Sequence, residues 1–547
     1  MRGRNVFLES LRAHGVTRIF GNPGTTESPL LDSLLDYPDI EYVMHLHEGV
    51  AVGAANVYAQ ATASTGVANM HVAPGLGNAI GMIYGALKNN SPMLITAGQQ
   101  DTRARLRDPV LGHDLVAMAA PVTKWAVQVE RADEMGPILN RAFKIANTAP
   151  CGPVFVSLPI NVMEQDTDIG PTTAGDLSVQ QPIAQSSLQA AVDLLNAAQR
   201  PGIVAGDDVD RCGALESLAA LSEKLAAPVH VELLSGRFGF PSQHPNFRGR
   251  LGPDHAGMQQ ALGGYDVVLL IGGPFFEEIW HTDTSPLAAD AKVIQIELDA
   301  SRLGHNIPLT LGLAGDVADA LHRIGNEIEI SAERVSALNE VNASIGAQTQ
   351  ERRTALWDRS PMTPTRALAE LGKAAPADAV VADESITASL DLVAAFAFGH
   401  GHTYYGGRGG GIGQGIAGAL GAAVGHPDRP VICVSGDGSA MYSIQALWTA
   451  AHHQLNILFV ILSNREYRVL KHNLDQYRQR FGVPSNKPYP HMNLAEPQLG
   501  FIAMAQGMGI PGQTLSHPEG IAGAVMTALQ TPGPYLLELE VEGLETR

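Results

Sequence analysis

The chain contains little cysteine and comparatively little positive charge. Among its 547 residues there are three cysteines, Cys151, Cys212 and Cys433, which stand far apart. They form neither a disulfide framework nor a zinc-binding motif, which favours a reducing compartment. The 36 lysines and arginines are outnumbered by 55 aspartates and glutamates, so the net charge is −19. This balance argues against nucleic acid or an anionic membrane as a partner, because both require a basic surface.

The sequence also has no long apolar run and no recognisable targeting segment. No stretch of 18 apolar residues runs without charges or Gly and Pro breaks, so no transmembrane helix is expected. Residues 1–12 lack the core of a signal peptide and are read as an amphipathic helix. We therefore expect a soluble, cytoplasmic protein. The 45% apolar and 17% charged residues are typical of a globular enzyme.

The pattern of apolar segments predicts three consecutive α/β domains, at residues 1–170, 186–330 and 360–547. In each domain short apolar strands alternate with helical segments, which indicates a doubly wound parallel sheet with helices on both faces. A stretch rich in Thr, Ser, Gln and Pro at about 166–185 is read as a linker. The segments expected to form strands are 17–20, 41–44, 67–72, 93–96, 154–157, 202–205, 229–232, 267–271, 293–297, 379–382, 431–435, 457–462 and 537–541.

Two apolar strands of the third domain each run into side chains that carry oxygen. The first ends at Gly436-Asp437-Gly438, and the second, about one helix later, ends at Asn464. Parallel strands present their carboxyl ends at one edge of the sheet, where ligands bind. Carboxylate and amide oxygens suit Mg²⁺ or Ca²⁺ better than zinc. Although Gly-Asp-Gly alone is often only a turn, this pair of strand ends favours a metal site.

These motifs resemble the Gly-Asp-Gly and Asn signature of thiamine diphosphate enzymes. The first domain carries further matching segments, namely Phe20-Gly21-Asn22-Pro23-Gly24, Glu48, residues 69–78 and residues 95–100. Within this superfamily the chain resembles the benzoylformate decarboxylases over essentially its whole length. The resemblance implies thiamine diphosphate as cofactor, bound with Mg²⁺ or alternatively Ca²⁺.

The resemblance implies roles for particular residues of the third domain. Asp437 and Asn464 would hold the metal, together with a main-chain carbonyl near Glu466. Gly410 would accept a hydrogen bond from the cofactor's amine, and Ile412 would support the folded cofactor from below. For Ser385 and Thr387, helix capping is an alternative to phosphate binding. The residues implied to contact the cofactor are Asn22, Asn78, Ser385, Thr387, Gly410, Ile412, Gly436, Gly438, Ser439 and Tyr467.

The catalytic residues implied by the resemblance come mainly from the first domain. Glu48 would exchange a proton with the aminopyrimidine ring and so activate the cofactor. His71 would act as a proton relay or as a partner of the substrate carboxylate. Thr25 stands where the decarboxylases have a serine. His281 is a candidate second histidine, but an ungapped match places Ile279 at that position, and a surface role for His281 stays open.

The leading functional hypothesis is non-oxidative decarboxylation of a 2-oxo acid to an aldehyde and CO₂. The alternative is a carboligase or aldehyde lyase that resembles acetolactate synthase; a non-catalytic relative is a third possibility. No Gly-x-Gly-x-x-Gly follows a strand in residues 186–330, so the flavin that acetolactate synthases hold in this domain is not expected.

The positions predicted to surround the substrate depart from the decarboxylase pattern. Gly406 and Asn473 stand where aromatic residues are expected, which would open the pocket and so favours the carboligase. Arg408, Arg468 and Lys471 flank the site; they are either surface charges or determinants of a larger, more anionic substrate.

The resemblance also implies an assembly. In this superfamily the two ends of the cofactor are held by different subunits, so Glu48 of one chain would serve a cofactor bound by another. We therefore expect a homodimer at minimum, and a homotetramer as the full assembly, acting on a small 2-oxo acid or aldehyde.

Overall fold

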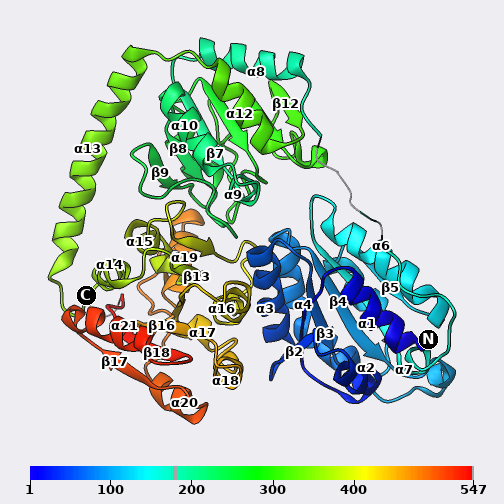
Figure 1. Cartoon of the computed structure of the whole chain (residues 1–547). Coiled ribbons are helices and arrows are strands. Elements are labelled where there is room, and N and C mark those ends of the chain that lie inside the picture. Colours follow the sequence, from blue (N-terminus) through cyan, green and yellow to red (C-terminus); the bar gives the residue numbers. More distant parts are fainter. Residues whose placement is uncertain (174, 176–180, 545–547) are drawn as a thin grey trace. The chain divides into compact units, whose positions relative to one another are not determined.

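The computed structural model describes residues 1–173, 175 and 181–544 and contains three six-stranded sheets (Figure 1). These sheets confirm the predicted fold class of three α/β domains. Residue contacts divide the chain into two compact units: Met1–Ser178 with Ala379–Thr387 and Gly407–Arg547, and Val179–Asp378 with Ala388–Gly406. The predicted boundaries of the three domains stay predictions, and residues 174 and 176–180 of the predicted linker lie outside the described residues.

The first sheet has the strand order β2-β1-β3-β4-β6-β5, and its strands pair in parallel. The strands are β1 (Arg18–Gly21), β2 (Glu41–Met44), β3 (Gly66–Met70), β4 (Met93–Gln99), β5 (Trp125–Gln128) and β6 (Pro153–Pro159). The α-helices are α1 (Gly3–Ala13), α2 (Ser28–Ser33), α3 (Glu48–Thr62), α4 (Val72–Lys88), α5 (Leu115–Ala119), α6 (Met135–Asn147) and α7 (Ile160–Met163).

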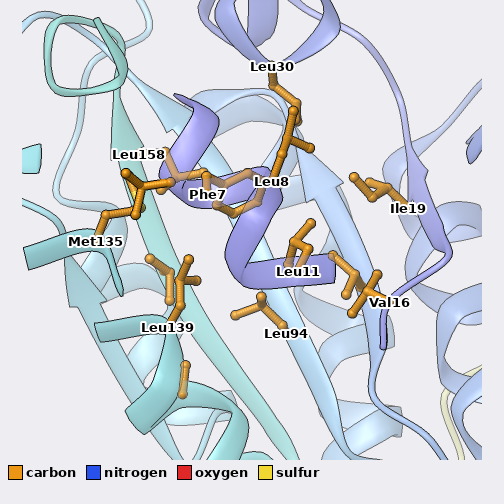
Figure 2. Packing of buried hydrophobic residues seen from close by; sticks show 14 of the residues in the cluster. Phe7, Leu8, Leu11, Val16, Ile19, Leu30, Leu94, Met135, Leu139 and Leu158 are labelled. Carbon is orange, nitrogen blue, oxygen red and sulfur yellow. The ribbon is translucent and has the colours of Figure 1, made fainter. Parts of the chain in front are cut away.

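Helix α1 places its apolar face in the core of this domain. Its residues Phe7, Leu8 and Leu11 are fully buried. They belong to one cluster with Leu94 of β4 and Leu139 of α6, and Figure 2 shows this packing. The amphipathic helix predicted at the N-terminus is therefore confirmed.

The third sheet contains, within the first unit, the parallel strands β13-β15-β16-β18-β17. Glu384 pairs with Ser435, and Gly436 pairs with Leu462, so three strands end side by side. The elements are β13 (Val380–Glu384), β15 (Val431–Gly436), β16 (Ile457–Ser463), β17 (Gly512–Leu515), β18 (Tyr535–Glu540), α16 (Gln414–Gly425), α17 (Asp437–Ala440), α18 (Ala446–His452), α19 (Arg468–Arg480), α20 (Phe501–Gly507) and α21 (Ile521–Gln530).

The middle sheet has the order β12-β11-β10-β7-β8-β9, and its strands also pair in parallel. This order places the switch point of a doubly wound sheet between β7 and β10. Its strands are β7 (Pro201–Ala205), β8 (Val229–Val231), β9 (Phe247–Arg250), β10 (Val267–Ile271), β11 (Lys292–Glu297) and β12 (Leu311–Ala314). The second unit further contains α8 (Gln185–Ala197), α9 (Asp207–Arg211), α10 (Leu215–Leu225), α11 (His255–Leu262), α12 (Val317–Glu327), α13 (Ala332–Trp357), α14 (Pro364–Ala374), α15 (Ser389–Ala395) and β14 (Thr403–Tyr405).

Helices α3 and α16, both in the first unit, pack along each other with glycines at the contact (Figure 1). A methyl group added at Gly421 of α16 would lie 1.9 Å from the Ala54 carbonyl oxygen of α3. One added at Gly53 would lie 2.7 Å from the Ala417 methyl group. Since these are closer than any van der Waals contact, only glycine allows the two backbones to approach in this way.

Two expectations about the whole chain can be compared with the structure. The three cysteines carry free thiols, which confirms that they form no disulfide framework. Among the described residues, no helix combines the length and the apolar character needed to cross a membrane.

The glycine contact makes a prediction about stability. We expect Gly421→Ala to lower the unfolding free energy by about 1 to 3 kcal/mol, because the new methyl group must displace backbone. Gly523→Ala in α21 is the matched control, since an added methyl group there meets no atom within 4 Å and alanine favours helix. Thermal unfolding of both variants measures the effect; an equal melting temperature for the two would contradict the packing argument.

Candidate active site

The two predicted metal-binding positions lie next to each other at the edge of the third sheet. Asp437 follows β15, and Asn464 follows the neighbouring strand β16. Their turns are joined by a hydrogen bond of 2.6 Å from the Arg465 backbone N–H to Asp437 Oδ2. The Asn464 side-chain oxygen accepts the Glu466 backbone N–H at 3.1 Å. The turns that carry Asp437 and Asn464 are therefore neighbours in the structure, as their spacing in the sequence predicts.

The Asp437 carboxylate is buried, with 3% of the residue exposed. Burial raises the pKa of Asp437 to about 6, although its hydrogen bonds to backbone N–H groups oppose the shift. A buried carboxylate is stabilised by a cation, and carboxylate and amide oxygens suit a divalent hard cation. In the described part of the chain, no three His, Cys, Asp or Glu side chains form a metal cluster. The donor set here is thus a carboxylate, an amide and backbone, as expected for Mg²⁺ rather than zinc.

Glu466 differs from the other two predicted metal residues, because its side chain forms a buried ion pair. Its carboxylate forms a buried ion pair with Lys471, and it accepts the Leu544 backbone N–H at 2.6 Å. Lys471 and Glu466 are 1% and 6% exposed, respectively. A main-chain carbonyl near Glu466 thus remains the predicted ligand, and the Glu466 side chain fixes the loop. Removing Lys471 would leave a buried charge, which is strongly destabilising.

The small residues around the metal turn have packing partners. A methyl group at Gly438 would lie 2.5 Å from the Tyr467 ring, so the glycine lets this ring cover the turn. Gly436 and Ser439 are half-buried and lie at the strand end and in the short helix α17. A methyl group added at Gly436 would lie 3.9 Å from its nearest neighbour, the Ser439 hydroxyl, so this side of the turn has room for a ligand.

The hydroxyl of Ser385 is engaged within its own turn. It donates to Asp383 Oδ1 at 2.6 Å, and the Ser385 backbone N–H donates to the same oxygen at 2.9 Å. Thr387 is half-buried in a short 3-10 helix after β13. This geometry favours a local role for Ser385, whereas the predicted phosphate contact of Thr387 stays a prediction.

The glycine-rich segment before α16 contains the other predicted cofactor positions. Gly410 and Gly413 have φ values of 68° and 99°, the left-handed region that favours glycine. A methyl group added at Gly410 would meet no atom within 4 Å, so one flank of the segment is open. Ile412 is half-buried between the two glycines. This open flank fits the predicted contact of Gly410 with a ligand.

Glu48 begins α3 and lies between two amide side chains of the first domain. The Asn22 amide donates to Glu48 Oε1 at 3.3 Å, and the Asn78 amide donates to Glu48 Oε2 at 3.1 Å. A methyl group at Gly75 would lie 2.9 Å from Glu48 Oε1. Glu48 is 6% exposed. The structure therefore brings Asn22, Glu48 and Asn78 together, and the two asparagines orient the Glu48 carboxylate.

His71 lies beside a buried carboxylate that motif spacing alone does not reveal. Glu27 Oε2 is 2.7 Å from His71 Nδ1, and Glu27 Oε1 accepts the Gly98 backbone N–H at 2.9 Å. Burial raises the pKa of the Glu27 carboxyl, and its hydrogen bond with His71 opposes this shift. A methyl group at Gly24 would lie 2.0 Å from His71 Nδ1, so only glycine admits the imidazole. An acid–base histidine needs a carboxylate that orients its ring, and only this requirement could have suggested Glu27 from the sequence.

The other two predicted catalytic residues are exposed. Thr25 lies at the start of a short 3-10 helix, next to the buried Thr26. The His281 side chain is 80% exposed in the second unit, 3.6 Å from Glu278 and 3.4 Å from Asp283. Their catalytic roles therefore remain predictions, and the surroundings of His281 fit the surface alternative.

Two of the residues predicted to surround the substrate, Gly406 and Arg468, are held by contacts with neighbouring residues. A methyl group added at Gly406 would lie 2.5 Å from the Tyr404 hydroxyl and 2.6 Å from the Ser235 carbonyl oxygen. The expectation that Gly406 opens a pocket is thus wrong, because the chain is tightly packed there. Arg468 donates to the Glu542 carbonyl oxygen at 3.0 Å, so this side chain is tied to neighbouring backbone. Arg408 is buried, and Asn473 is half-buried on α19.

Three residues other than glycine adopt left-handed backbone next to predicted site residues. Val72, Ile386 and Arg465 have φ values of 41°, 51° and 59°. Each directly follows a predicted site residue, namely His71, Ser385 and Asn464. Such conformations cost of order 1 to 3 kcal/mol each and persist where the surrounding structure imposes them. Such strained turns at the carboxyl ends of β3, β13 and β16 are consistent with the predicted functional positions there.

The turn at the switch point of the middle sheet carries acidic side chains. Asp207 and Asp208 follow β7 and are buried, and Asp208 forms an ion pair with Arg211. At the end of β11, burial raises the pKa of Glu297 to about 8. Asp208 also lies 4.0 Å from Arg302, so two arginines face this carboxylate. The absence of a flavin, which the sequence leads us to expect, stays a prediction.

Comparisons with known proteins agree with this geometry. Models of the thiamine pyrophosphate enzymes match the chain in three parts: the N-terminal TPP binding domain at residues 1–118, the central domain at 188–324 and the C-terminal TPP binding domain at 389–539. Benzoylformate decarboxylase of Pseudomonas aeruginosa is 31% identical over 98% of both chains. The acetolactate synthase large subunit of Parasynechococcus marenigrum is 28% identical over 98% of this chain and 87% of its own. The solved thiamine diphosphate-dependent 4-hydroxybenzoylformate decarboxylase of Rhodococcus jostii RHA1 is 28% identical over 99% of both chains, with a TM-score of 0.86.

The chain therefore belongs to the thiamine pyrophosphate enzyme family. The residues present fit the family's cofactor, because hard oxygen donors, open glycine backbone and a buried glutamate occur together in the first unit. The roles predicted for Asp437 and Asn464 as metal ligands and for Glu48 at the pyrimidine ring stay predictions.

The Glu27–His71 pair makes a prediction about catalysis. We expect Glu27→Gln to lower kcat by at least about tenfold, because His71 loses the anion that orients its ring. Its melting temperature should not fall, since burial disfavours the Glu27 charge. Steady-state kinetics and thermal unfolding measure the two effects, with the half-exposed Glu164→Gln as control. Equal kcat for the two variants would contradict the role given to Glu27.

Proposed function

We propose that this enzyme decarboxylates a 2-oxo acid without oxidation and releases an aldehyde and CO₂. The observation that carries the proposal is the Glu27–His71 pair, in which an imidazole is oriented by a buried carboxylate 2.7 Å away. His71 precedes α4, and Gly75, which contacts Glu48, lies in the first turn of this helix. One helical turn rises about 5 Å. His71 and Gly75, beside which the Glu48 carboxylate lies, are thus about one helical turn apart.

The chain's own residues divide the work of such a reaction. When bound, thiamine diphosphate supplies the carbon nucleophile and accepts the electron pair released with CO₂. Asp437 and Asn464 would hold Mg²⁺ or Ca²⁺ for the diphosphate end of the cofactor. Glu48 would be the proton-exchanging group for the pyrimidine ring, and the amides of Asn22 and Asn78 keep its carboxylate in place. His71 holds the proton that is delivered to the product carbon.

The proposed assembly rests on the resemblance to the superfamily, in which different subunits hold the two ends of the cofactor. Glu48 belongs to the first domain, whereas Asp437 and Asn464 belong to the third. We propose that a second copy of the chain completes each site, as a homodimer or a homotetramer.

A carboligase resembling acetolactate synthase is the second candidate, favoured by the 28% identity to such a subunit. It requires room for a second carbonyl compound. The tight packing around Gly406 removes one argument for that room. The decarboxylase proposal therefore has the stronger support.

A turnover assay tests the proposal. With thiamine diphosphate and Mg²⁺, the protein should release CO₂ and the matching aldehyde from at least one of a panel of 2-oxo acids that includes benzoylformate. Glu48→Gln should lower kcat by a factor of about 100 or more, because cofactor activation is lost. Glu9→Gln, a change on the surface of α1, serves as control. Full activity of Glu48→Gln would overturn the assigned mechanism.

The same assay separates the two candidate reactions. In a mixture of a 2-oxo acid and an aldehyde, a decarboxylase gives mainly the free aldehyde. A 2-hydroxy ketone as the main product would instead identify the carboligase. Failure to turn over any 2-oxo acid would exclude both proposals.

A further inference from the structure

A buried glutamate at the end of β13 has no role in the mechanism described above. Glu384 is 5% exposed. Its Oε1 accepts the backbone N–H groups of Gly413 and Gln414 at 2.8 and 3.0 Å. Its Oε2 accepts the backbone N–H of Gly415 at 3.1 Å. One carboxylate thus binds three successive N–H groups at the start of α16, which is 12 residues long.

The same turn is held from its other side by a serine. The Ser443 hydroxyl donates to the Gly413 carbonyl oxygen at 2.8 Å, and Ser443 is 1% exposed. A methyl group at Gly413 would lie 2.9 Å from the Tyr442 side chain, and at Gly415 it would lie 2.5 Å from the Glu384 Cβ atom. Both the N–H and the carbonyl of Gly413 are therefore fixed by buried side chains.

Opposing effects act on the pKa of Glu384. Burial raises the pKa of Glu384 to about 8, although the three N–H donors favour the charged form. The nearby Asp383 raises this pKa further. A buried carboxylate in this state is costly to keep unless it serves the geometry of the turn. The N–H that it holds at Gly413 belongs to the residue directly after Ile412 and three residues after Gly410, the residues proposed to contact the thiamine rings.

We propose that Glu384 and Ser443 are positioning residues that fix Gly410 and Ile412 for recognition of the thiamine part of the cofactor. The inference rests on the proposed role of these two residues. Asp437 and Asn464 bind the diphosphate end from other turns, so the loss of Glu384 affects one end of the ligand. Glu384 therefore contributes to selectivity for thiamine diphosphate over inorganic diphosphate.

Calorimetric titration of the full chain tests this division, using thiamine diphosphate and inorganic diphosphate separately, each with Mg²⁺. In Glu384→Gln the affinity for thiamine diphosphate should fall by about tenfold or more. The affinity for inorganic diphosphate should change less than about twofold, because the metal turn is intact. Glu297→Gln is the matched control, since Glu297 is also a buried strand-end glutamate with a pKa raised to about 8. It should bind both ligands as the unmodified chain does.

Other outcomes are equally informative. If Glu384→Gln and the unmodified chain bind thiamine diphosphate with equal affinity, the inference is overturned, and the proposed function is not. An equal loss of affinity for both ligands would also overturn it, because a merely structural role of Glu384 predicts that result. If Glu384→Gln does not fold, Ser443→Ala gives the same comparison, because it removes only a neutral hydroxyl. No binding of thiamine diphosphate by the unmodified chain would overturn the proposed function as well.

Discussion

The close packing of α3 on α16 is the constraint on which the first unit depends. Glycine and alanine line the contact, and a methyl group at Gly421 would lie 1.9 Å from a backbone oxygen. Each helix begins at a predicted functional position, α3 with Glu48 and α16 after the segment that carries Gly410 and Ile412. Any larger side chain at the contact would move the start of one helix relative to the other. The small-residue composition of both helices is thus a requirement of the fold of the first unit.

Buried carboxylates recur around these helix starts, and each is stabilised differently. Glu48 accepts hydrogen bonds from two asparagine amides, Glu27 faces an imidazole, and Glu384 accepts three backbone N–H groups. Asp437 has only backbone donors in its described hydrogen bonds, and its pKa is raised to about 6. This difference fits the proposed division of labour, in which Asp437 would hold a metal cation and the other three carboxylates would act on protons or on the geometry of the protein.

The sequence predicted the central strands and the edge strand β2, but it missed the other edge strands, β5, β9, β12, β14 and β17. Strands β5, β9, β12 and β17 lie at edges and are largely half-exposed, so they lack the apolar runs that identify buried strands. The metal motif was predictable because the parallel register of β15 and β16 brings Asp437 and Asn464 together. Glu27 and Glu384 were not, because their roles depend on contacts with residues distant in sequence, such as His71 and Gly413. Gly406 was misread, because a glycine that packs tightly looks in sequence like one that leaves space.

The central claim is that Asp437 and Asn464 hold the cofactor while Glu48 activates it. The most direct measurement is the dissociation constant of thiamine diphosphate in the presence of Mg²⁺ for Asp437→Asn and Glu48→Gln. The account predicts that Asp437→Asn weakens binding by about 100-fold or more, as expected when a charged metal ligand is lost, whereas Glu48→Gln binds within a few-fold of the unmodified chain. Tight binding by Asp437→Asn, or loss of binding only in Glu48→Gln, would contradict it.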